Sequence, residues 1–384
     1  MSNSPNLKAD ILIVDDTSAN LRLLSQMLLD KGYEVRAVTS GARALESVSV
    51  SLPDLILLDI KMAEMDGYEV CRRLKQDEHS CEIPVIFISA LDDIQDKMSA
   101  FQVGGVDYIT KPFQLEEVLA RIQTHLHLRQ LRRSLEVANR KMAHELEMAA
   151  KMQNNFFPHE LPELTGYELS ATLKPARETS GDFYDVFELQ GGYYGILIAD
   201  VVDKGVAAAL FMVLSWSLLR TYAREYPHQP EKVFEAVNQR LLQDTGGEQY
   251  VTAFYGVLNP HTGEMFYSNA GHLPPLQLSR ADGSLQKLER TGVPLGIFEE
   301  QTWTCGKTTL LPGEILVCYT DGVLDAQNMQ GEFFDMDRLL TAIRKRSEMA
   351  ARQVQAGILS DIAGYMEDAE QFDDIALIVL RRQA

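Results

Sequence analysis

Short apolar runs alternate with helical patterns over the first third of the chain. The apolar runs are ILIV at 11–14, LILL at 55–58, PVIFI at 84–88 and VDYI at 106–109. The segments with helical spacing include 18–31, 67–76 and 92–103. Short buried strands that alternate with helices predict βαβ units and a parallel sheet covered by helices on both faces. We therefore expect an α/β domain in residues 1–123.

The next stretch, 126–157, contains neither glycine nor proline. Its apolar residues stand at 128, 131, 135, 138 and 142, and the order of the three- and four-residue steps changes at 146 and 149. A seam of this kind is typical of a coiled coil with a stutter. The pattern predicts a helical connector over 124–157 that joins two copies of the chain as a homodimer. The alternative is a long helix that packs on its own domain.

Strand-like runs dominate the chain after Pro158. They include YYGILIAD at 193–200, YVTAFYGVL at 250–258, EMFYSNAG at 264–271, EILVCYTDG at 314–322 and DDIALIVL at 373–380. Two helical stretches, at about 205–224 and 230–243, separate the earlier runs from the later ones. We expect residues 158–384 to form an α+β sandwich with its helices outside the sheets.

Composition and charge narrow the classes of function. The chain has 384 residues, 46% of them apolar, and a formal net charge of −19. Two acidic parts flank the basic connector, which argues against DNA as a partner because its phosphates would meet like charge. The alternative is that the acidic surface only confers solubility. The four cysteines form no CxxC pattern, and we find no apolar run near the ~18 residues of a membrane helix. We expect a cytoplasmic protein with no membrane contact.

Polar side chains end the apolar runs of the first domain. Asp15 and Asp16 follow the first run, Asp59 ends the second, Ser89 the third, and Lys111 comes just after the fourth. The carboxyl ends of parallel strands meet at one edge, where such sheets bind ligands. Three carboxylates there would repel each other unless a cation lay among them, and oxygen ligands suit Mg²⁺. Asp59 is then a plausible nucleophile for a phosphoryl group.

These residues resemble the receiver domain of two-component response regulators over about residues 8–123. The matching motifs are Asp15-Asp16, DLILLDIKM with Asp59, FISA with Ser89 and TKPF with Lys111. The resemblance implies a flavodoxin-like, doubly wound five-stranded parallel sheet, and a sensor histidine kinase or phosphotransfer protein that loads Asp59.

The same resemblance implies roles for further residues. Mg²⁺ would lie among the acids, bound by Asp16 and Asp59 beside Asp15, with help from the Lys61 carbonyl. Ser89 and Tyr108 would move when Asp59 is phosphorylated, and the peptide bond between Lys111 and Pro112 would be cis. The segment 62–67 lacks the family's usual proline after the methionine, so we expect a changed turn there.

Acids also stand where strands of the second domain begin or end. They are Asp182 in SGDFYDVF, Asp200 in ADVVDKG, Asp321 in YTDG and the pair Asp373-Asp374 in FDDIALIV. Glycines beside three of these clusters permit tight turns or close approach to a ligand. No histidine or cysteine accompanies the acids at zinc-ligand spacing, so oxygen ligation of Mg²⁺ or Mn²⁺ is expected. Several carboxylates can hold two such ions ~4 Å apart for an in-line displacement at phosphorus.

Residues of about 145–383 resemble the metal-dependent type-2C (PPM) Ser/Thr protein phosphatases, in their SpoIIE/RsbU-like branch. The matching stretches are PARETSGDFYDVF, ADVVDKGVAAALF, NAGHLPP, GVPLGIF, YTDGVLDAQN and FDDIALIVL. The resemblance implies two Mn²⁺ or Mg²⁺ ions that activate water, without a phosphoenzyme. The implied ligands are Asp182, Asp200 as the bridging acid, the carbonyl of Val201, Asp321 and Asp373.

Some positions depart from the family pattern, and others have two possible roles. Eukaryotic members have a histidine, as a candidate general acid, where this chain has Val202. Arg177 is a candidate phosphate contact because its planar fork suits phosphate, and its alternative is a surface salt bridge. Asn269, His272 and Asp374 match the pattern, the first two mostly as architecture. Two unusual acids, Asp325 and Asp335, are expected outside the metal set.

Together these features predict a response regulator in which phosphorylation of Asp59 controls a Ser/Thr protein phosphatase through the connector. The resemblance implies a phosphorylated anti-sigma-factor antagonist as the substrate. The alternative is a non-catalytic adaptor that binds a regulatory protein, although such proteins have lost the metal acids. A transcription factor would need a basic recognition helix, which the acidic C-terminal domain lacks.

Overall fold

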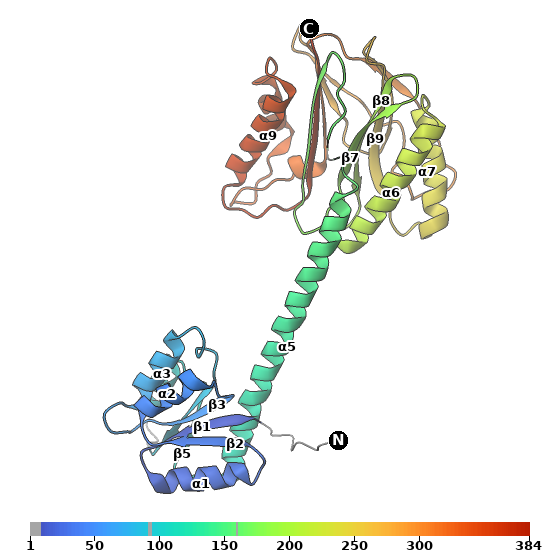
Figure 1. Ribbon diagram of the computed structural model, residues 1–384. Coiled ribbons are helices and arrows are strands. Elements are labelled where there is room, and N and C mark those ends of the chain that lie inside the picture. Colours follow the sequence, from blue (N-terminus) through green and yellow to red (C-terminus); the bar gives the residue numbers. More distant parts are fainter. Residues whose placement is uncertain (1–8, 91–93, 159) are drawn as a thin grey trace. The chain divides into compact units, whose positions relative to one another are not determined.

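The computed structural model describes residues 9–90, 94–158 and 160–384. Contacts divide the chain into two compact units, one up to Lys141 and one from Met142 onward. Each unit has its own hydrophobic core. Figure 1 labels the helices and strands of both units.

The first unit is a parallel five-stranded sheet with the order β2-β1-β3-β4-β5. Its strands are β1 (Asp10–Val14), β2 (Glu34–Val38), β3 (Leu55–Asp59), β4 (Val85–Ser89) and β5 (Asp107–Thr110). Its helices are α1 (Ser18–Leu29), α2 (Gly41–Val50), α3 (Gly67–Gln76), α4 (Ile94–Gln102) and the start of α5 (Leu115–Asn154). Core residues place α1 and α5 on one face and α2, α3 and α4 on the other. The expected doubly wound fold is confirmed.

Helix α5 runs without a break for 40 residues, from Leu115 to Asn154. Its first turns belong to the core of the first unit, where Val118 and Ile122 are fully buried. The sequence pattern separated this part from the connector at residue 124, but the helix itself has no boundary there. The expected helical connector is therefore confirmed, and its pairing with a second chain stays a prediction.

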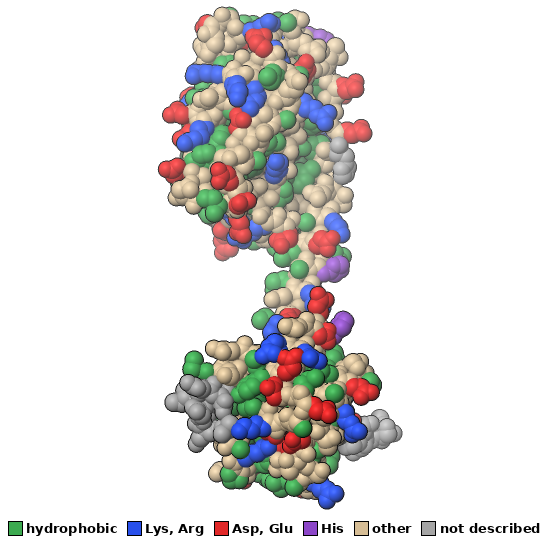
Figure 2. Space-filling view, turned by 90° about the vertical axis from the view of Figure 1, so that its left-hand side faces the viewer, with side chains coloured by type: hydrophobic (Ala, Val, Ile, Leu, Met, Phe, Trp, Pro, Cys, Tyr) green, Lys and Arg blue, Asp and Glu red, His purple; other side chains and the backbone are tan. Residues whose placement is uncertain are grey.

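The apolar seam of the connector faces solvent. Leu128, Leu131, Leu135 and Met142 are each more than half exposed. Figure 2 shows apolar side chains at the surface between charged ones along this stretch. This exposure favours the dimer over the alternative, a long helix packed on its own domain, which side-chain contacts support as far as Arg133.

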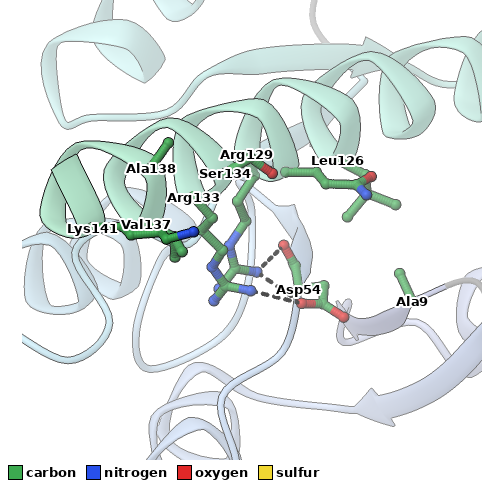
Figure 3. A pocket seen from close by; sticks show the side chains of 10 residues that line it. Ala9, Asp54, Leu126, Arg129, Arg133, Ser134, Val137, Ala138 and Lys141 are labelled. Carbon is green, nitrogen blue, oxygen red and sulfur yellow. Dashed lines mark hydrogen bonds and ion pairs between the residues drawn. The ribbon is translucent and has the colours of Figure 1, made fainter. Parts of the chain in front are cut away.

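Two arginines fix α5 to the first unit (Figure 3). The Arg129 guanidinium donates to the carbonyl oxygens of Pro53, at 3.0 Å, and of Asp54. The Arg133 guanidinium lies 3.8 Å from the Asp54 carboxylate. Pro53 and Asp54 come just before β3, whereas Asp59 stands at the other end of that strand. The helix is thus held to the sheet well beyond residue 123.

The second unit contains two five-stranded sheets with the orders β13-β10-β9-β8-β7 and β12-β11-β14-β15-β6. The first sheet consists of β7 (Phe183–Leu189), β8 (Tyr193–Val201), β9 (Val251–Leu258), β10 (Glu264–Ala270) and β13 (Gly306–Thr309). The second consists of β6 (Tyr167–Lys174), β11 (Leu276–Leu278), β12 (Leu285–Lys287), β14 (Ile315–Tyr319) and β15 (Ile375–Arg382). Every pair of neighbouring strands in both sheets is antiparallel.

Helices cover the outer faces of these sheets. The inner faces meet in a core that includes Ile196, Ile198, Cys318 and Ile378. Helices α6 (Val206–Glu225) and α7 (Pro230–Thr245) pack on the first sheet. Helices α8 (Asp335–Arg344) and α9 (Ala351–Met366) pack on the second. The expected α+β sandwich with outer helices is confirmed.

Helix α6 corrects one expectation from the sequence. It is long and apolar enough to cross a membrane by length and composition, although no run of that length was expected. Its residues Phe211, Met212 and Leu219 are buried against the first sheet of the second unit. The core helix of a soluble protein passes the same test, so the finding is weak evidence for a membrane span.

Candidate functional site

Three carboxylates meet at one edge of the first unit. One carboxylate oxygen from each of Asp15, Asp16 and Asp59 lies within 4.8 Å of the other two. Asp15 and Asp16 follow β1, and Asp59 ends the neighbouring strand β3. The Nζ of Lys111, just beyond β5, lies 2.9 Å from Asp15 and 3.1 Å from Asp59. Parallel pairing thus brings together residues that the sequence placed on separate strand ends.

Asp15 and Asp16 have different surroundings. Asp15 is fully buried and accepts hydrogen bonds from the Thr17 N–H, at 2.8 Å, and from the Asn20 amide, at 2.9 Å and 3.1 Å. Asp16 is exposed. Asp15 is therefore held in place by the protein, whereas Asp16 and Asp59 are better placed to bind a cation. Asn20 was not anticipated, because a single asparagine in a helical pattern gives no signal.

Burial and charge shift the pKa values in this cluster. Burial raises the pKa of Asp59, although its hydrogen bond with Lys111 opposes the shift. Burial alone would lower the pKa of Lys111, but its bonds to Asp15 and Asp59 reverse the effect and raise it. The lysine therefore stays charged and neutralises part of the repulsion between the acids.

The other expected receiver residues stand on or just after β3, β4 and β5. Ser89 ends β4 and is buried, and the Lys111–Pro112 peptide bond is cis as expected. Tyr108 lies with its ring 5.5 Å from the Arg121 guanidinium. The Lys61 side chain is exposed, just after β3. The turn that follows contains Glu64 in a left-handed conformation, with φ 66°.

The acids of the second unit surround one small pocket. Its volume is about 310 Å³, and its lining includes Asp200, Asp321, Asp373 and Asp374. Asp200 stands near the end of β8, in the first sheet. Asp321 follows β14 and Asp373 precedes β15, which are neighbours in the second sheet. The pocket therefore draws acids from both sheets, as the sequence pattern led us to expect.

Asp182 lies beside this pocket and is almost completely buried, with 2% exposure. Its Oδ2 has no hydrogen-bond partner among the residues that the structure describes. Burial, and then the charge of Asp200, raises the pKa of Asp182 well above its usual range. A buried carboxylate oxygen without a partner is costly, and a cation would satisfy it. The residues therefore fit a divalent ion.

The pKa values of the neighbouring acids are raised as well. Burial, and then the charge of Asp321, raises the pKa of Asp200 to about 7. Burial, and then the charge of Asp373, raises the pKa of Asp321 to about 6. Within the described ranges, however, no three of these four acids have oxygens that all lie within 4.8 Å of one another. The acids therefore line the pocket without forming a tight cluster of oxygens.

Asp374 has a different environment from Asp373. Its Oδ1 accepts from the Ala176 N–H at 2.7 Å, and its Oδ2 accepts from the Ser180 hydroxyl and the Gly181 N–H, both at 2.8 Å. The side chain thus ties the loop before Asp182 to the start of β15. A side-chain carbon at Gly322 would overlap the Asp374 carbonyl oxygen, so glycine is required for this close approach.

Two residues near the pocket were not assigned a role from the sequence. The Nζ of Lys204 lies 2.9 Å from Asp373 Oδ2 and donates to the Phe372 carbonyl at 2.8 Å. Asp325 was expected outside the metal set, but burial and then the charge of Asp373 raise its pKa. It is therefore an electrostatic neighbour of the cluster, while Asp335 pairs with Arg338 on α8.

The remaining candidates differ in their relation to the pocket. Arg177 is exposed on the loop between β6 and β7, next to Ala176. Val202 lines the pocket and offers no proton donor in its side chain. Asn269 is fully buried, with its amide directed to the Leu288 carbonyl at 3.4 Å. His272 lies 2.9 Å from the Thr252 hydroxyl, and burial lowers the pKa of His272 to about 4, so the ring is neutral.

Comparisons with known proteins agree with this division of the chain. The family model for the response regulator receiver domain matches residues 11–123. The model for Stage II sporulation protein E (SpoIIE) matches residues 190–383.

Two relatives are similar to this chain over more than half of its length. Protein IcfG of Synechocystis sp. is 30% identical over 336 residues, which are 79% of this chain and 52% of IcfG. This chain therefore spans about half the length of that relative. Phosphoserine phosphatase RsbU of Bacillus subtilis is 28% identical over 239 residues, which are 62% of this chain and 70% of RsbU.

A solved structure supports the fold of the second unit. The SiaA-PP2C domain of Pseudomonas aeruginosa aligns with a TM-score of 0.57 and 20% identity, and covers 64% of this chain and 98% of that domain. The second unit is thus a PP2C-like phosphatase domain joined to a receiver domain. With the match over residues 190–383, this chain belongs to the SpoIIE family.

Proposed function

We propose that this chain is a response regulator in which phosphorylation of Asp59 controls a metal-dependent phosphoserine/phosphothreonine protein phosphatase. The observation that carries the proposal is the pocket lined by Asp200, Asp321 and Asp373, with the unpaired Oδ2 of buried Asp182 beside it. Strongly perturbed carboxylates in a cleft are typical of functional sites. Their oxygen-only donor set suits two Mn²⁺ or Mg²⁺ ions.

The proposed ligands are the carboxylates of Asp182, Asp200, Asp321 and Asp373 and the carbonyl of Val201. When bound, the ions would activate water and neutralise the charge of the phosphoryl group. Asp374 acts differently, because both of its oxygens already accept hydrogen bonds from the 176–181 loop. It positions Asp182 rather than binding the ions.

Hydrolysis breaks the bond between phosphorus and the serine or threonine oxygen. We assign Arg177 as a phosphate contact, since it is exposed beside the loop that Asp374 holds. Val202 cannot donate a proton, so the leaving oxygen receives its proton from solvent. No side chain forms a covalent intermediate in this scheme.

The receiver domain performs a different reaction on phosphorus. The Asp59 carboxylate forms a bond to the phosphorus atom of the donor, and the bond from phosphorus to the donor's histidine nitrogen breaks. Lys111 faces the product because it already lies 3.1 Å from Asp59. We assign Mg²⁺ binding to Asp16, Asp59 and the Lys61 carbonyl, with Asp15 beside them, and the response to phosphorylation to Ser89 and Tyr108.

The proposed partners follow from this arrangement. A sensor histidine kinase or phosphotransfer protein loads Asp59, and the resemblance to RsbU supports a phosphorylated anti-sigma-factor antagonist as the substrate. The exposed seam of α5 supports a homodimer through the connector. We propose a cytoplasmic protein with functional limits at 1–123, 124–157 and 158–384.

A second candidate is a non-catalytic adaptor that binds a regulatory protein. The four phosphatase acids favour the enzyme, because an adaptor has no need of a buried carboxylate oxygen without a partner.

The test is hydrolysis of p-nitrophenyl phosphate by the full chain with Mn²⁺, with and without beryllofluoride, which mimics phosphorylated Asp59. Asp59→Ala is the control, because it removes the site where beryllofluoride binds. We expect turnover that depends on Mn²⁺ and changes with the mimic in the wild-type chain only. Absence of turnover with every metal, and with a phosphoprotein substrate, would favour the adaptor.

A further inference from the structure

A buried glutamine at the end of α5 holds the loop that carries Asp182. Gln153 is only 5% exposed, one residue before the helix ends at Asn154. Its Nε2 donates to the Ser180 carbonyl at 2.6 Å, and its Oε1 accepts from the Ser180 N–H at 3.0 Å. One side-chain amide therefore satisfies both main-chain groups of a fully buried residue.

Ser180 in turn contacts two acids of the site, Asp374 and Asp182. Its hydroxyl lies 2.8 Å from Asp374 Oδ2 and 3.1 Å from the Asp182 carbonyl oxygen, and its single proton is shared between these two acceptors. The next residue, Gly181, donates its N–H to the same Asp374 oxygen. Gln153 is thus separated from two acids of the site by a single residue.

Aromatic packing surrounds this polar contact. Phe156 meets Trp216 of α6 edge-on at 5.5 Å, and Phe157 stacks on Tyr184 of β7 at 6.4 Å. Hydrogen bonds weaken steeply when their geometry changes. A shift of α5 would therefore weaken the bonds between Gln153 and Ser180.

We propose that Gln153 is a positioning residue through which the placement of α5 sets the metal affinity of the phosphatase pocket. This inference rests on the proposed function and names the contact by which the connector acts on the site. Groups that orient metal ligands change affinity by ~10–100-fold when they are removed. The rival interpretation is that Gln153 only satisfies the main chain of Ser180.

The experiment uses the full chain and the variant Gln153→Met, which keeps the length of the side chain but loses both hydrogen bonds. Mn²⁺ binding is measured by titration calorimetry, with Asp182→Ala identifying the heat that belongs to the phosphatase pocket. We expect the variant to bind Mn²⁺ at that pocket ~10-fold more weakly. Asn154→Met is the matched control, because Asn154 is the exposed neighbour on the same turn, and it should bind as the wild type does.

Hydrolysis of p-nitrophenyl phosphate supplies a second measurement. Gln153→Met should require more Mn²⁺ for half-maximal turnover, recover turnover at high Mn²⁺, and lose its response to beryllofluoride. Ser180→Ala keeps both main-chain bonds to Gln153 but removes the hydroxyl bond to Asp374, so it should weaken Mn²⁺ binding as well. The double variant should lose less than the sum of the two single losses, because the residues act in series.

Two outcomes would overturn the inference. One is a Gln153→Met chain with unchanged Mn²⁺ binding and an unchanged response to beryllofluoride. The other is a chain that melts at a lower temperature but keeps its Mn²⁺ affinity, since that result fits a merely structural role. If the wild-type chain binds Mn²⁺ but hydrolyses nothing, the proposed function fails while calorimetry still decides the role of Gln153.

Discussion

The two acidic clusters of this protein solve the same electrostatic problem in different ways. The receiver cluster contains its own cation, since Lys111 lies 2.9 Å from Asp15 and 3.1 Å from Asp59. Thr17 and Asn20 supply further donors to Asp15. The receiver acids are therefore partly compensated by the protein itself.

The phosphatase cluster is compensated far less. Lys204 pairs with Asp373, but Asp182 keeps an unpaired oxygen, and the pKa of Asp200 is raised to about 7. If both sites bind the proposed ions, we therefore expect the receiver site to be stable before Mg²⁺ binds and the phosphatase site to need its ions for stability.

The largest effect is expected for Asp182→Ala and Asp373→Ala. Loss of a ligand should remove several kcal/mol of charge stabilisation, so Mn²⁺-dependent turnover should fall by on the order of 10³-fold. Phosphorylation of Asp59, followed by phosphate-affinity electrophoresis, should be intact. Asp335→Ala is the control, because that acid pairs with Arg338 on α8. Unchanged turnover in both variants would sink the metal assignment.

Lys111→Met should make the receiver cluster resemble the phosphatase cluster. It leaves two buried carboxylates without their cation, which should lower the free energy of unfolding by about 3 kcal/mol. Mg²⁺ should then raise the melting temperature of the variant more than that of the wild type.

Lys75→Met is the matched control for this variant. Lys75 donates to the carbonyls of Cys81 and Ile83 in the same unit, away from the acids. Its loss should destabilise the protein without any gain from Mg²⁺. Equal gains from Mg²⁺ in both variants would contradict the proposed role of Lys111 as a built-in cation.

The contrast also predicts how stabilisation by Mn²⁺ depends on pH. The folded pKa values of Asp200, about 7, and Asp321, about 6, lie above the usual aspartate value. The metal-free protein should therefore lose stability as pH rises from the unfolded to the folded pKa, when these acids become charged. Mn²⁺ should raise the melting temperature little near about pH 5 and by several degrees near about pH 8.

Scanning fluorimetry with Mn²⁺ or with chelator measures this difference directly. Taking the difference removes the contribution of His272, because its buried ring is neutral in the folded protein at both pH values. Asp200→Asn should flatten the pH dependence. A Mn²⁺ effect that is equally large at both pH values would contradict the raised pKa values.

The smallest effect is expected for Asn20→Ala. Asp15 would lose the amide that donates to both of its oxygens. Removing a donor to a buried charged group should cost about 1–2 kcal/mol in urea unfolding. Gln26→Ala removes a bond to exposed Asp30 on the same helix and should cost less than about 0.5 kcal/mol. Equal costs would show that Asp15 does not depend on its donors.

Much of the fold and most of the acids could be predicted from the sequence, because their signals lie in short stretches of the chain. Apolar runs mark buried strands, and the acids that end them, such as Asp59 and Asp200, mark the sheet edges. The pattern also predicted the helical nature of 124–157. It did not show that this helix begins at Leu115, because the residues before 124 pack in the core of the first unit and were assigned to that domain.

The remaining residues depend on contacts between distant segments. Gln153 is an ordinary polar residue in a helical pattern until the last turn of α5 meets Ser180, 27 residues later. The pair Asp373-Asp374 gives no local sign of which carboxylate accepts hydrogen bonds from the 176–181 loop, and the structure shows that it is Asp374. Lys204 is held by an ion pair with Asp373, which lies far along the chain in the loop before β15.

The strand order of the second sheet has a consequence for the synthesis of the protein. The first strand of the domain, β6, pairs with β15, and Tyr167 stands opposite Arg382. Contacts between such distant segments form late in folding. Asp373 stands two residues before β15 begins at Ile375, so a nascent chain or one that ends before this segment cannot assemble the pocket. Activity would therefore appear only after nearly the whole domain has left the ribosome.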